Sequence, residues 1–308
     1  MTNNTTASNN IGERQNSAPM IKLLRARRRV YGHVKGLQRV YFLIALVLPI
    51  ISLVVAFNFD KAKPSLSLLA LIIGALDAMF FDPWRKQKIK MAARLQEEFD
   101  CHVLEMAWNK FTAGARVSPE DVDAYGRELL KRDAEGQLKD WYPSDARRLP
   151  LHLARLVCQR TNLWYDSKLR RTYRTCLWAI TALYFLALLM FGLDLPLSDF
   201  ILAVLVPFGP FFTWVVREHH RQTDTIALVD RLTGEIEGSI DRLSNPESQE
   251  DAQARARELQ DAIFAHRAGS PLVSDLVYKF KRRTLEEQMQ AGASEFIARV
   301  TSASRAVR

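Results

Sequence analysis

The sequence predicts an all-α membrane protein, with four transmembrane helices in two short hairpins and helical cytoplasmic regions between and after them. Three observations lead to this prediction. Four segments of the 308-residue chain are apolar and nearly uncharged, very short linkers join them in pairs, and basic residues flank both pairs. About 20 apolar residues cross a bilayer core about 30 Å thick, and no segment shows convincing strand-like alternation.

The chain divides into six regions by composition. The first twenty residues are polar, contain no apolar core of a signal peptide and are expected to form a disordered tail. In chain order, the regions are a disordered tail (1–20), a basic cytoplasmic helix (21–39), the first transmembrane hairpin (40–82), a cytoplasmic helical region (83–175), the second transmembrane hairpin (176–216) and cytoplasmic C-terminal helices (217–308).

Within the hairpins, the four apolar segments are residues 40–59, 65–82, 176–193 and 198–216. The linkers DKAKP and DLPLS each contain a proline, which favours a tight turn. Buried helices of a soluble core are the alternative, but the length and the scarcity of charge favour membrane spans.

Basic residues set the predicted orientation. They precede the first and third apolar segments and follow the second, whereas the DLPLS turn has none. By the positive-inside rule, both termini and the middle region are cytoplasmic. The net charge of +9 is then largely a topology signal, so the lipid bilayer is the expected partner and neither DNA nor RNA is expected.

The residues that carry chemistry in known enzymes do not form a familiar pattern here. Three cysteines, Cys101, Cys158 and Cys176, are an odd number without a CxxC pair, which favours reduced thiols. The sequence contains no HExxH, Walker, GxGxxG or GxSxG motif. We therefore expect no enzyme activity, no catalytic residue, no cofactor and no metal. The acidic cluster Glu97–Asp100 is interpreted as a solvated face or as salt-bridge partners.

One carboxylate, Asp77, interrupts the second apolar segment. It belongs to a stripe of mostly small residues at spacings of three and four, namely Ser67, Ala70, Gly74, Asp77 and Phe81. Small residues let helices approach closely, so the stripe should face a neighbour, and a carboxylate near mid-bilayer costs roughly 2.5–3.5 kcal/mol. Asp77 could face a pore or only a neighbouring helix, and it is either protonated or partnered by Thr181, Tyr184 or a base at the cytoplasmic edge.

The fourth apolar segment contains Pro207, Gly209 and Pro210, and two prolines predict a kink. These three residues, together with Ser67, Gly74 and Asp77, are predicted either to line a pore or to pack helices against one another. Further along, apolar residues between Ile226 and Leu243 form a seam that either joins subunits or packs within one subunit.

Two groups of aromatic and polar residues in the cytoplasmic regions are candidates for sensing a ligand. Stacking and hydrogen bonds from such side chains hold nucleotides, although the same residues equally pack helices under a membrane. The candidates are Trp141, Tyr142, Gln159, Arg160, Asn162 and Trp164.

Several motifs, in this order, resemble a known family. They are RQN, LRARRRVYGHVKG, a hairpin, KIKMAARLQEEFDCHVLEMAWNK, DWYP, CQRTNLWYDSKLRRTYR, a second hairpin, REHHRQ and SPLVSDLVYKFKRRTLEEQM. The chain from about Arg14 to Met289 resembles the SMODS-associating four-transmembrane effectors of bacteria, described as pore-forming. The resemblance implies an anti-phage effector in the inner membrane that permeabilises it and stops the infected cell. Its trigger would be a cyclic oligonucleotide from an associated nucleotidyltransferase.

Four spans with so few polar residues cannot line a wet pore alone, so a pore would require a homo-oligomer. The alternative is a non-conducting, membrane-anchored sensor or scaffold whose cytoplasmic helices bind a protein partner. A small transporter is less compatible with the sequence, because the spans are not interrupted at matching places in both halves.

Overall fold

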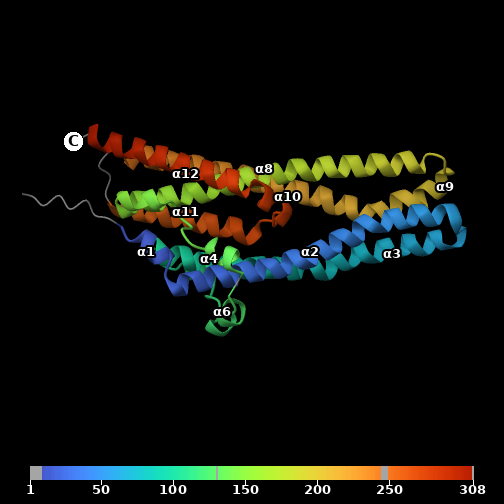
Figure 1. Ribbon diagram of the computed structural model, residues 1–308, viewed down its shortest axis with the longest axis horizontal. Helices are drawn as coiled ribbons and strands as arrows, with labels where there is room; N and C mark the ends of the chain where they lie inside the picture. Colours follow the sequence, from blue (N-terminus) through green and yellow to red (C-terminus); the bar gives the residue numbers. More distant parts are fainter. Residues whose placement is uncertain (1–8, 130, 244–248, 307–308) are drawn as a thin grey trace, which may run out of the picture. The chain divides into compact units, whose positions relative to one another are not determined.

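The computed structural model describes residues 9–129, 131–243 and 249–306, and within these ranges every regular element is a helix (Figure 1). The all-α prediction is therefore confirmed. The chain forms two compact units. Unit 1 comprises residues 1–31, 89–170 and 225–308, and unit 2 comprises residues 32–88 and 171–224.

Unit 2 is made from the apolar parts of long helices. Its first half contains the end of α2 (Ala18–Asn58), the 3-10 turn η1 (Asp60–Ala62), α3 (Lys63–Leu76), the π-helical turn η2 (Asp77–Phe81) and the start of α4 (Asp82–Val103). Its second half contains the end of α8 (Leu151–Gly192), α9 (Leu197–Phe200), the π-helical turn η4 (Ile201–Leu205) and the start of α10 (Val206–Leu243). Four helices are long and apolar enough to cross a membrane, as predicted.

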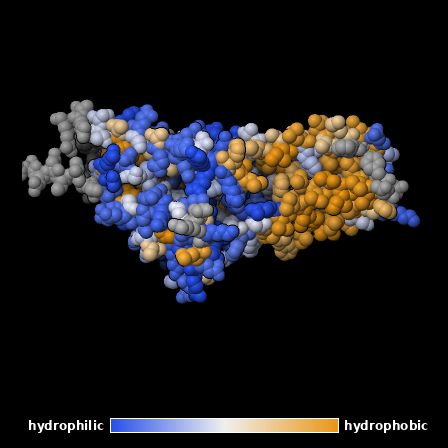
Figure 2. Space-filling model, in the orientation of Figure 1, coloured by the Kyte–Doolittle hydropathy of each residue, from blue (hydrophilic) through white to orange (hydrophobic). Residues whose placement is uncertain are grey.

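The surface of unit 2 is rich in exposed hydrophobic side chains. Among the described residues, all the large hydrophobic side chains classed as exposed lie in this unit except four, which are Phe111, Leu129, Leu276 and Phe280. Figure 2 shows the hydrophobic colouring of its visible face. Inside, an aromatic cluster packs around Phe211, whose ring lies 5.4 Å from that of Tyr184 and 5.7 Å from that of Phe42.

The turns of the two hairpins contact each other. Lys63 Nζ lies 2.8 Å from Asp199 Oδ2, and the Lys63 side chain is only 5% exposed. At the second turn, an added Cβ on Gly192 would lie 2.8 Å from the ring of Phe200, so the absence of a side chain lets α8 and α9 approach closely. Glycine at this position fixes the geometry of the second hairpin.

Unit 1 contains the polar parts of the long helices and several shorter ones. The additional elements are α1 (Ile11–Gln15), α5 (Lys110–Ala113), α6 (Pro119–Gly126), α7 (Arg132–Gly136), the 3-10 turn η3 (Ser144–Arg148), α11 (Gln249–Gly269) and α12 (Asp275–Ala306). They enclose an apolar core that includes Leu24, Phe99, Leu156 and Ile236. Ser118 caps α6 by accepting a hydrogen bond from the Asp121 amide at 3.1 Å, as its position before Pro119 suggests.

The expected disordered tail is too long. Residues 1–8 of this region lie outside the described residues, but Ile11–Gln15 form α1 and α2 begins at Ala18. Ile11 is 1% exposed, and the Asn9 side chain donates to the carbonyls of Ala146 and Leu149, both at 2.8 Å. A few scattered apolar residues among many polar ones give too weak a hydrophobic signal to predict this packing.

The apolar seam of α10 packs within one chain. Ile226, Val229, Ile236 and Ile240 are at most 3% exposed, and three of them belong to the core of unit 1. The Leu243 side chain lies outside the described residues. Of the two interpretations of this seam, the structure supports packing within one subunit for the described residues.

Candidate functional site

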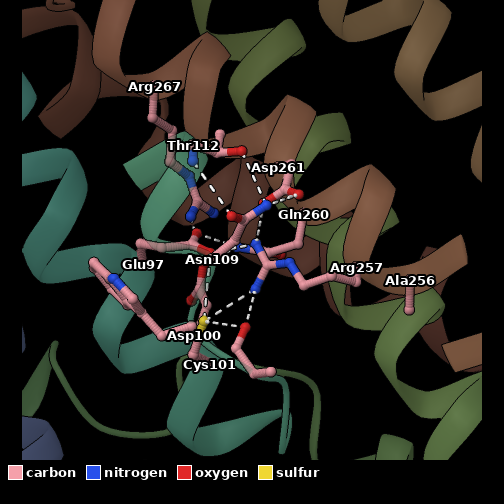
Figure 3. Close-up of polar contacts among 12 residues, drawn as sticks. Glu97, Asp100, Cys101, Asn109, Thr112, Ala256, Arg257, Gln260, Asp261 and Arg267 are labelled. Carbon is pink, nitrogen blue, oxygen red and sulfur yellow. Dashed lines mark hydrogen bonds and ion pairs between the residues drawn. The ribbon is translucent and has the colours of Figure 1, made fainter. Parts of the chain in front are cut away.

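The most concentrated group of buried charges lies on α4 in unit 1 (Figure 3). Glu97 and Asp100 are three residues apart on one face of this helix, at 1% and 0% exposure. Ala93 on the same face and Leu104, the residue directly after the end of α4, are apolar and fully buried. A buried charge is tolerated only when it is paired and hydrogen-bonded, and both carboxylates meet this condition.

Asp100 accepts hydrogen bonds from three different parts of the chain. Its Oδ1 receives the Tyr142 hydroxyl and the Gln96 amide, each at 2.7 Å, and its Oδ2 receives the Gln260 amide at 3.1 Å. Arg267 also donates to Oδ2 and forms an ion pair with it. Asp100 thus joins α4 to α11 and to the loop before η3.

Glu97 holds the middle of α11. Arg257 donates to its Oε1 at 2.6 Å and Gln260 to its Oε2 at 2.8 Å. Burial raises the pKa of Glu97, and the charge of Asp100 raises it further, while Arg257 and Gln260 act in the opposite direction. Asp261, one turn after Arg257, accepts from Arg257 and from Asn109, both at 2.7 Å.

Arg257 also contacts the thiol of Cys101, with its Nη1 3.2 Å from the sulfur. Burial raises the pKa of Cys101 to about 12, and the charge of Glu97 adds to this effect. The thiol is therefore protonated and unreactive at neutral pH. Burial, followed by the charge of Asp100, likewise raises the pKa of the Tyr142 phenol well above its ordinary value, so Tyr142 acts as a neutral donor.

The network joins α4 to α11 through ion pairs. Its carboxylates are neutralised by arginines that belong to α11, and its thiol and phenol are protonated. Among the described residues, no three His, Cys, Asp or Glu side chains are grouped so that they could hold a metal ion. The Arg257 and Arg267 side chains keep 18% and 17% of their area exposed, so these two cations of the network are partly accessible to solvent.

The structure divides the six predicted ligand-sensing residues. Three of them belong to the network: Tyr142 binds Asp100, Gln159 donates to the Ala256 carbonyl at 2.9 Å and to Gln260 at 3.0 Å, and Asn162 lies 3.4 Å from the Tyr142 hydroxyl. Tyr142 and Gln159 are each 1% exposed and engage protein partners. They therefore do not present an open surface to a ligand.

The other three lie elsewhere. Arg160 donates to Glu237 at 2.6 Å and its guanidinium lies 4.6 Å from the Phe296 ring, while Trp164 has Lys168 at 6.0 Å from its ring. Residues 160, 164 and 168 follow the i, i+4, i+8 stripe of α8, on a different face from residues 159 and 162. Trp141 stacks with Arg27, whose guanidinium is 4.4 Å from the ring.

Asp77 faces a neighbouring helix in unit 2. It is 3% exposed, and its Oδ2 forms an ion pair with Arg217 of α10, the base that follows the fourth apolar segment. Among the partners considered from the sequence, a base is therefore the correct one. Thr181 donates to the Leu177 carbonyl at 2.8 Å, and Tyr184 donates to the Leu46 carbonyl at 2.5 Å.

Ser67 and Gly74 of the small-residue stripe face the second hairpin, whereas Phe81 is exposed. The Ser67 hydroxyl donates to the Leu202 carbonyl at 2.7 Å, and a Cβ on Gly74 would lie 3.8 Å from the Pro210 ring. Pro207 and Pro210 are buried and Gly209 is half-buried. The backbone irregularity near these prolines is the π-helical turn η4, which ends two residues before Pro207.

A second charged cluster follows Asp77 by one turn. Asp82 binds Arg85, Lys86 at 2.7 Å and Arg221 at 3.1 Å. Asp82 and Arg85 are 7% and 9% exposed, so the acid and this base are withdrawn from solvent, whereas the Lys86 side chain is 62% exposed. Arg217 and Arg221 are four residues apart on α10, which lets one helix face bind both Asp77 and Asp82.

Sequence reasoning missed Glu97, Asp100, Arg257, Gln260 and Arg267 as a set. The interpretation of Glu97–Asp100 as a solvated face is wrong, while their interpretation as salt-bridge partners is correct. The available signal was the placement of both acids on the same helix face as Ala93. The partners on α11 are about 160 residues away in the chain and have no sequence signal of their own.

The sequence matches the SMODS-associating 4TM effector domain over residues 9–296, nearly the whole chain. The chain belongs to this family. A relative described as a probable CBASS effector molecule of Bacillus cereus (strain VD146) is 26% identical over 286 residues, which cover 90% of this chain and 95% of the relative. No solved structure matches the chain. As a member of a four-transmembrane family with four membrane-compatible helices, this effector is a multi-pass membrane protein.

Proposed function

We propose that this effector permeabilises the bacterial inner membrane as an oligomer within a nucleotide-signalling anti-phage system, with both termini in the cytoplasm and without enzymatic activity. Family membership and the likeness to a probable CBASS effector support the role. The observation that carries the membrane-permeabilising mechanism is the division of unit 2 into an apolar outer surface and inward-facing charged groups.

The arrangement of unit 2 supports a closed resting state. Ser67, Asp77 and Asp82 bind partners in η4 and α10, so these polar groups of the first hairpin are used internally. These groups can line water only if the hairpins separate. Separation in several adjacent copies would gather polar groups around a common axis, which a single four-helix chain cannot do.

The membrane test uses the Asp77–Arg217 pair. Arg217→Gln leaves a carboxylate at 3% exposure without its cation, whereas Asp77→Asn leaves a cation whose side chain is 29% exposed. Because an unpaired buried charge is the more costly one, Arg217→Gln should depolarise cells more readily than Asp77→Asn. The double variant should be milder than Arg217→Gln, and Asp194→Asn, at an exposed turn position, is the matched control.

The decisive measurement is planar-bilayer conductance of the purified protein, with and without a panel of cyclic oligonucleotides. Conductance that appears only with one cyclic oligonucleotide is the expected result. An unchanged membrane potential and normal growth under full activation would contradict the proposal. They would favour a non-conducting sensor or scaffold that binds a protein partner.

The proposed trigger acts on the network of unit 1. A cyclic oligonucleotide carries several phosphates, which compete with carboxylates for arginine because both accept paired N–H donors. Arg257 and Arg267 are the partly exposed cations of the network, and both bind acids on α4. Phosphates that captured these arginines would remove the ion pairs that hold α11 to Glu97 and Asp100 and leave only the hydrogen bonds of Gln260.

This trigger is tested by measuring cyclic-oligonucleotide binding to Arg257→Gln and Arg267→Gln. Both variants should bind the activating nucleotide at least tenfold more weakly, since each loses a charge-assisted contact. Arg283→Gln, at an arginine whose side chain is 92% exposed, is the control and should bind normally. Undiminished binding by both network variants would exclude these arginines as the sensing groups.

A further inference from the structure

The first turns of α12 carry an exposed face that the proposed function does not use. Leu276 and Phe280 are both 79% exposed and are four residues apart on this helix. Among the described residues, they are two of the four exposed large hydrophobic side chains outside unit 2. Lys279 and Arg283 are exposed on the same side of the helix, at spacings of three and seven from Leu276.

The opposite side of α12 packs against protein. Leu285 is 6% exposed, and Phe296 and Ile297 belong to the core of unit 1. The helix is therefore fixed by one side, and the face with Leu276 and Phe280 is free to meet a partner. At its far end, Glu287 accepts from Arg283 at 3.0 Å in a highly exposed pair, an arrangement that contributes little energy in water.

A hydrogen bond from α8 holds the linker that precedes this face. Arg170 of α8 donates to the Pro271 carbonyl at 2.8 Å and holds the linker that leads into α12. In the sequence, Arg170 precedes Cys176, where the third apolar segment begins, by six residues of the same helix. Six residues of α-helix correspond to a rise of about 9 Å. The linker that leads into α12 is thus bound to α8 at a residue six positions before the third apolar segment begins.

Further contacts fix the same linker. His266 Nε2 lies 2.9 Å from Asp166 Oδ2, and Ser270 lies 2.9 Å from the other ring nitrogen of His266. Arg170 donates to the same Asp166 oxygen at 2.7 Å. The end of α11, the linker and α8 are therefore tied together by buried polar groups, so the face of α12 is held and does not trail from a loose segment.

We propose that Leu276, Lys279, Phe280 and Arg283 dock the start of α12 on the anionic surface of the bilayer that the protein spans. The two apolar side chains enter the headgroup boundary and the two cations pair with lipid phosphates, which is the arrangement of interfacial amphipathic helices. A second protein copy fits this face less well. Two apolar side chains provide much less than the roughly 800 Å² per partner that a stable protein interface buries.

The experiment measures the depth of position 276 in proteoliposomes of the full chain. A nitroxide is attached through Leu276→Cys in a Cys176→Ser background, because Cys101 and Cys158 are buried and escape labelling. With vesicles that contain phosphatidylglycerol, the label should collide more with dissolved oxygen, which concentrates in lipid, than with a water-soluble nickel chelate. A label at the 99% exposed Phe111 position is the aqueous control.

Two comparisons distinguish lipid docking from a contact with protein. Replacing phosphatidylglycerol by phosphatidylcholine, or substituting Lys279→Gln and Arg283→Gln, should move the label at 276 to the aqueous accessibility of the Phe111 control. Phe280→Ser should have the same effect by removing the apolar anchor. The proposal is overturned if the label is aqueous in phosphatidylglycerol vesicles. It is equally overturned if the label is shielded from both reagents, since that result indicates a protein contact.

Discussion

Removing the arginine that neutralises Asp100 tests whether the buried network holds unit 1 together. Asp100 is fully buried and would keep the hydrogen bonds from Tyr142, Gln96 and Gln260 in the variant Arg267→Met. It would lose its countercharge. Breaking a buried ion pair by removing one partner costs about 3–5 kcal/mol, because the remaining charge is uncompensated.

Peptide-resolved hydrogen exchange of the whole protein measures this cost where it arises. If the free energy of opening unit 1 falls by about 3–5 kcal/mol, the amides that exchange only when the unit opens exchange faster. At 1.4 kcal/mol per tenfold, the acceleration is about 10²- to 10³-fold or more. The acceleration should appear in the peptides of α4 and α11. Peptides from the apolar segments of unit 2 provide an internal reference.

Substitutions of Arg267 and of Asp100 should destabilise unit 1 by different amounts. Asp100→Asn leaves Arg267 unpaired, but this side chain is 17% exposed and can turn to water, so its cost should be the smaller one. The double variant removes both charges and should be less destabilised than the sum of the single variants. An Arg267→Met variant that exchanges as slowly as the exposed control Arg283→Gln would refute the reasoning.

Three further predictions concern stability and reactivity. Gly126→Ala should destabilise unit 1 by about 1–3 kcal/mol, because its Cβ would lie 2.9 Å from the Lys22 carbonyl oxygen, whereas Gly136→Ala, with no atom within 4 Å, should be neutral in thermal unfolding. Cys101, with its pKa raised by burial to about 12, should resist alkylation at pH 8 until the unit opens, as followed by mass spectrometry. Burial opposes the charged form of Asp166, but Arg170 and His266 outweigh this effect and lower the pKa of Asp166. The ionised Asp166 therefore stabilises the folded state above about pH 4, and this contribution is lost as the pH falls further. Asp166→Asn should therefore reduce the difference between unfolding midpoints at pH 7 and pH 3.

The transmembrane architecture could be predicted because its signals are local. Each apolar segment is recognisable by its own length and composition, and the stripe from Ser67 to Asp77 correctly points towards another helix. The identity of the partner was beyond the sequence, since Arg217 is 140 residues away and many other bases flank the spans. An ion pair between residues far apart in the chain produces no periodic pattern in the sequence around either residue.

The cytoplasmic network was harder to predict for a different reason. Acids such as Glu97 and Asp100 are usually solvated, and only their tertiary partners make burial tolerable. The aromatic and polar segment 158–166 was recognised as unusual, but its side chains alternate between two faces of α8. Gln159 therefore enters the network while Arg160 pairs with Glu237. A cluster in sequence became two separate clusters once the helical period was imposed.

Both units use carboxylate–guanidinium pairs at positions where an apolar contact would also fill the space. Such pairs add little stability over apolar packing, but breaking one is expensive, at about 3–5 kcal/mol. A ligand needs about 5.5 kcal/mol of differential affinity to move a two-state equilibrium from 1:99 to 99:1. Under the proposed trigger, capture of Arg257 or Arg267 by a phosphate removes a stabilising pair of this size and creates a new one with the ligand. An anion cannot compete for an apolar contact in this way. The buried ion pairs can therefore respond to an anionic ligand, whereas the apolar core cannot.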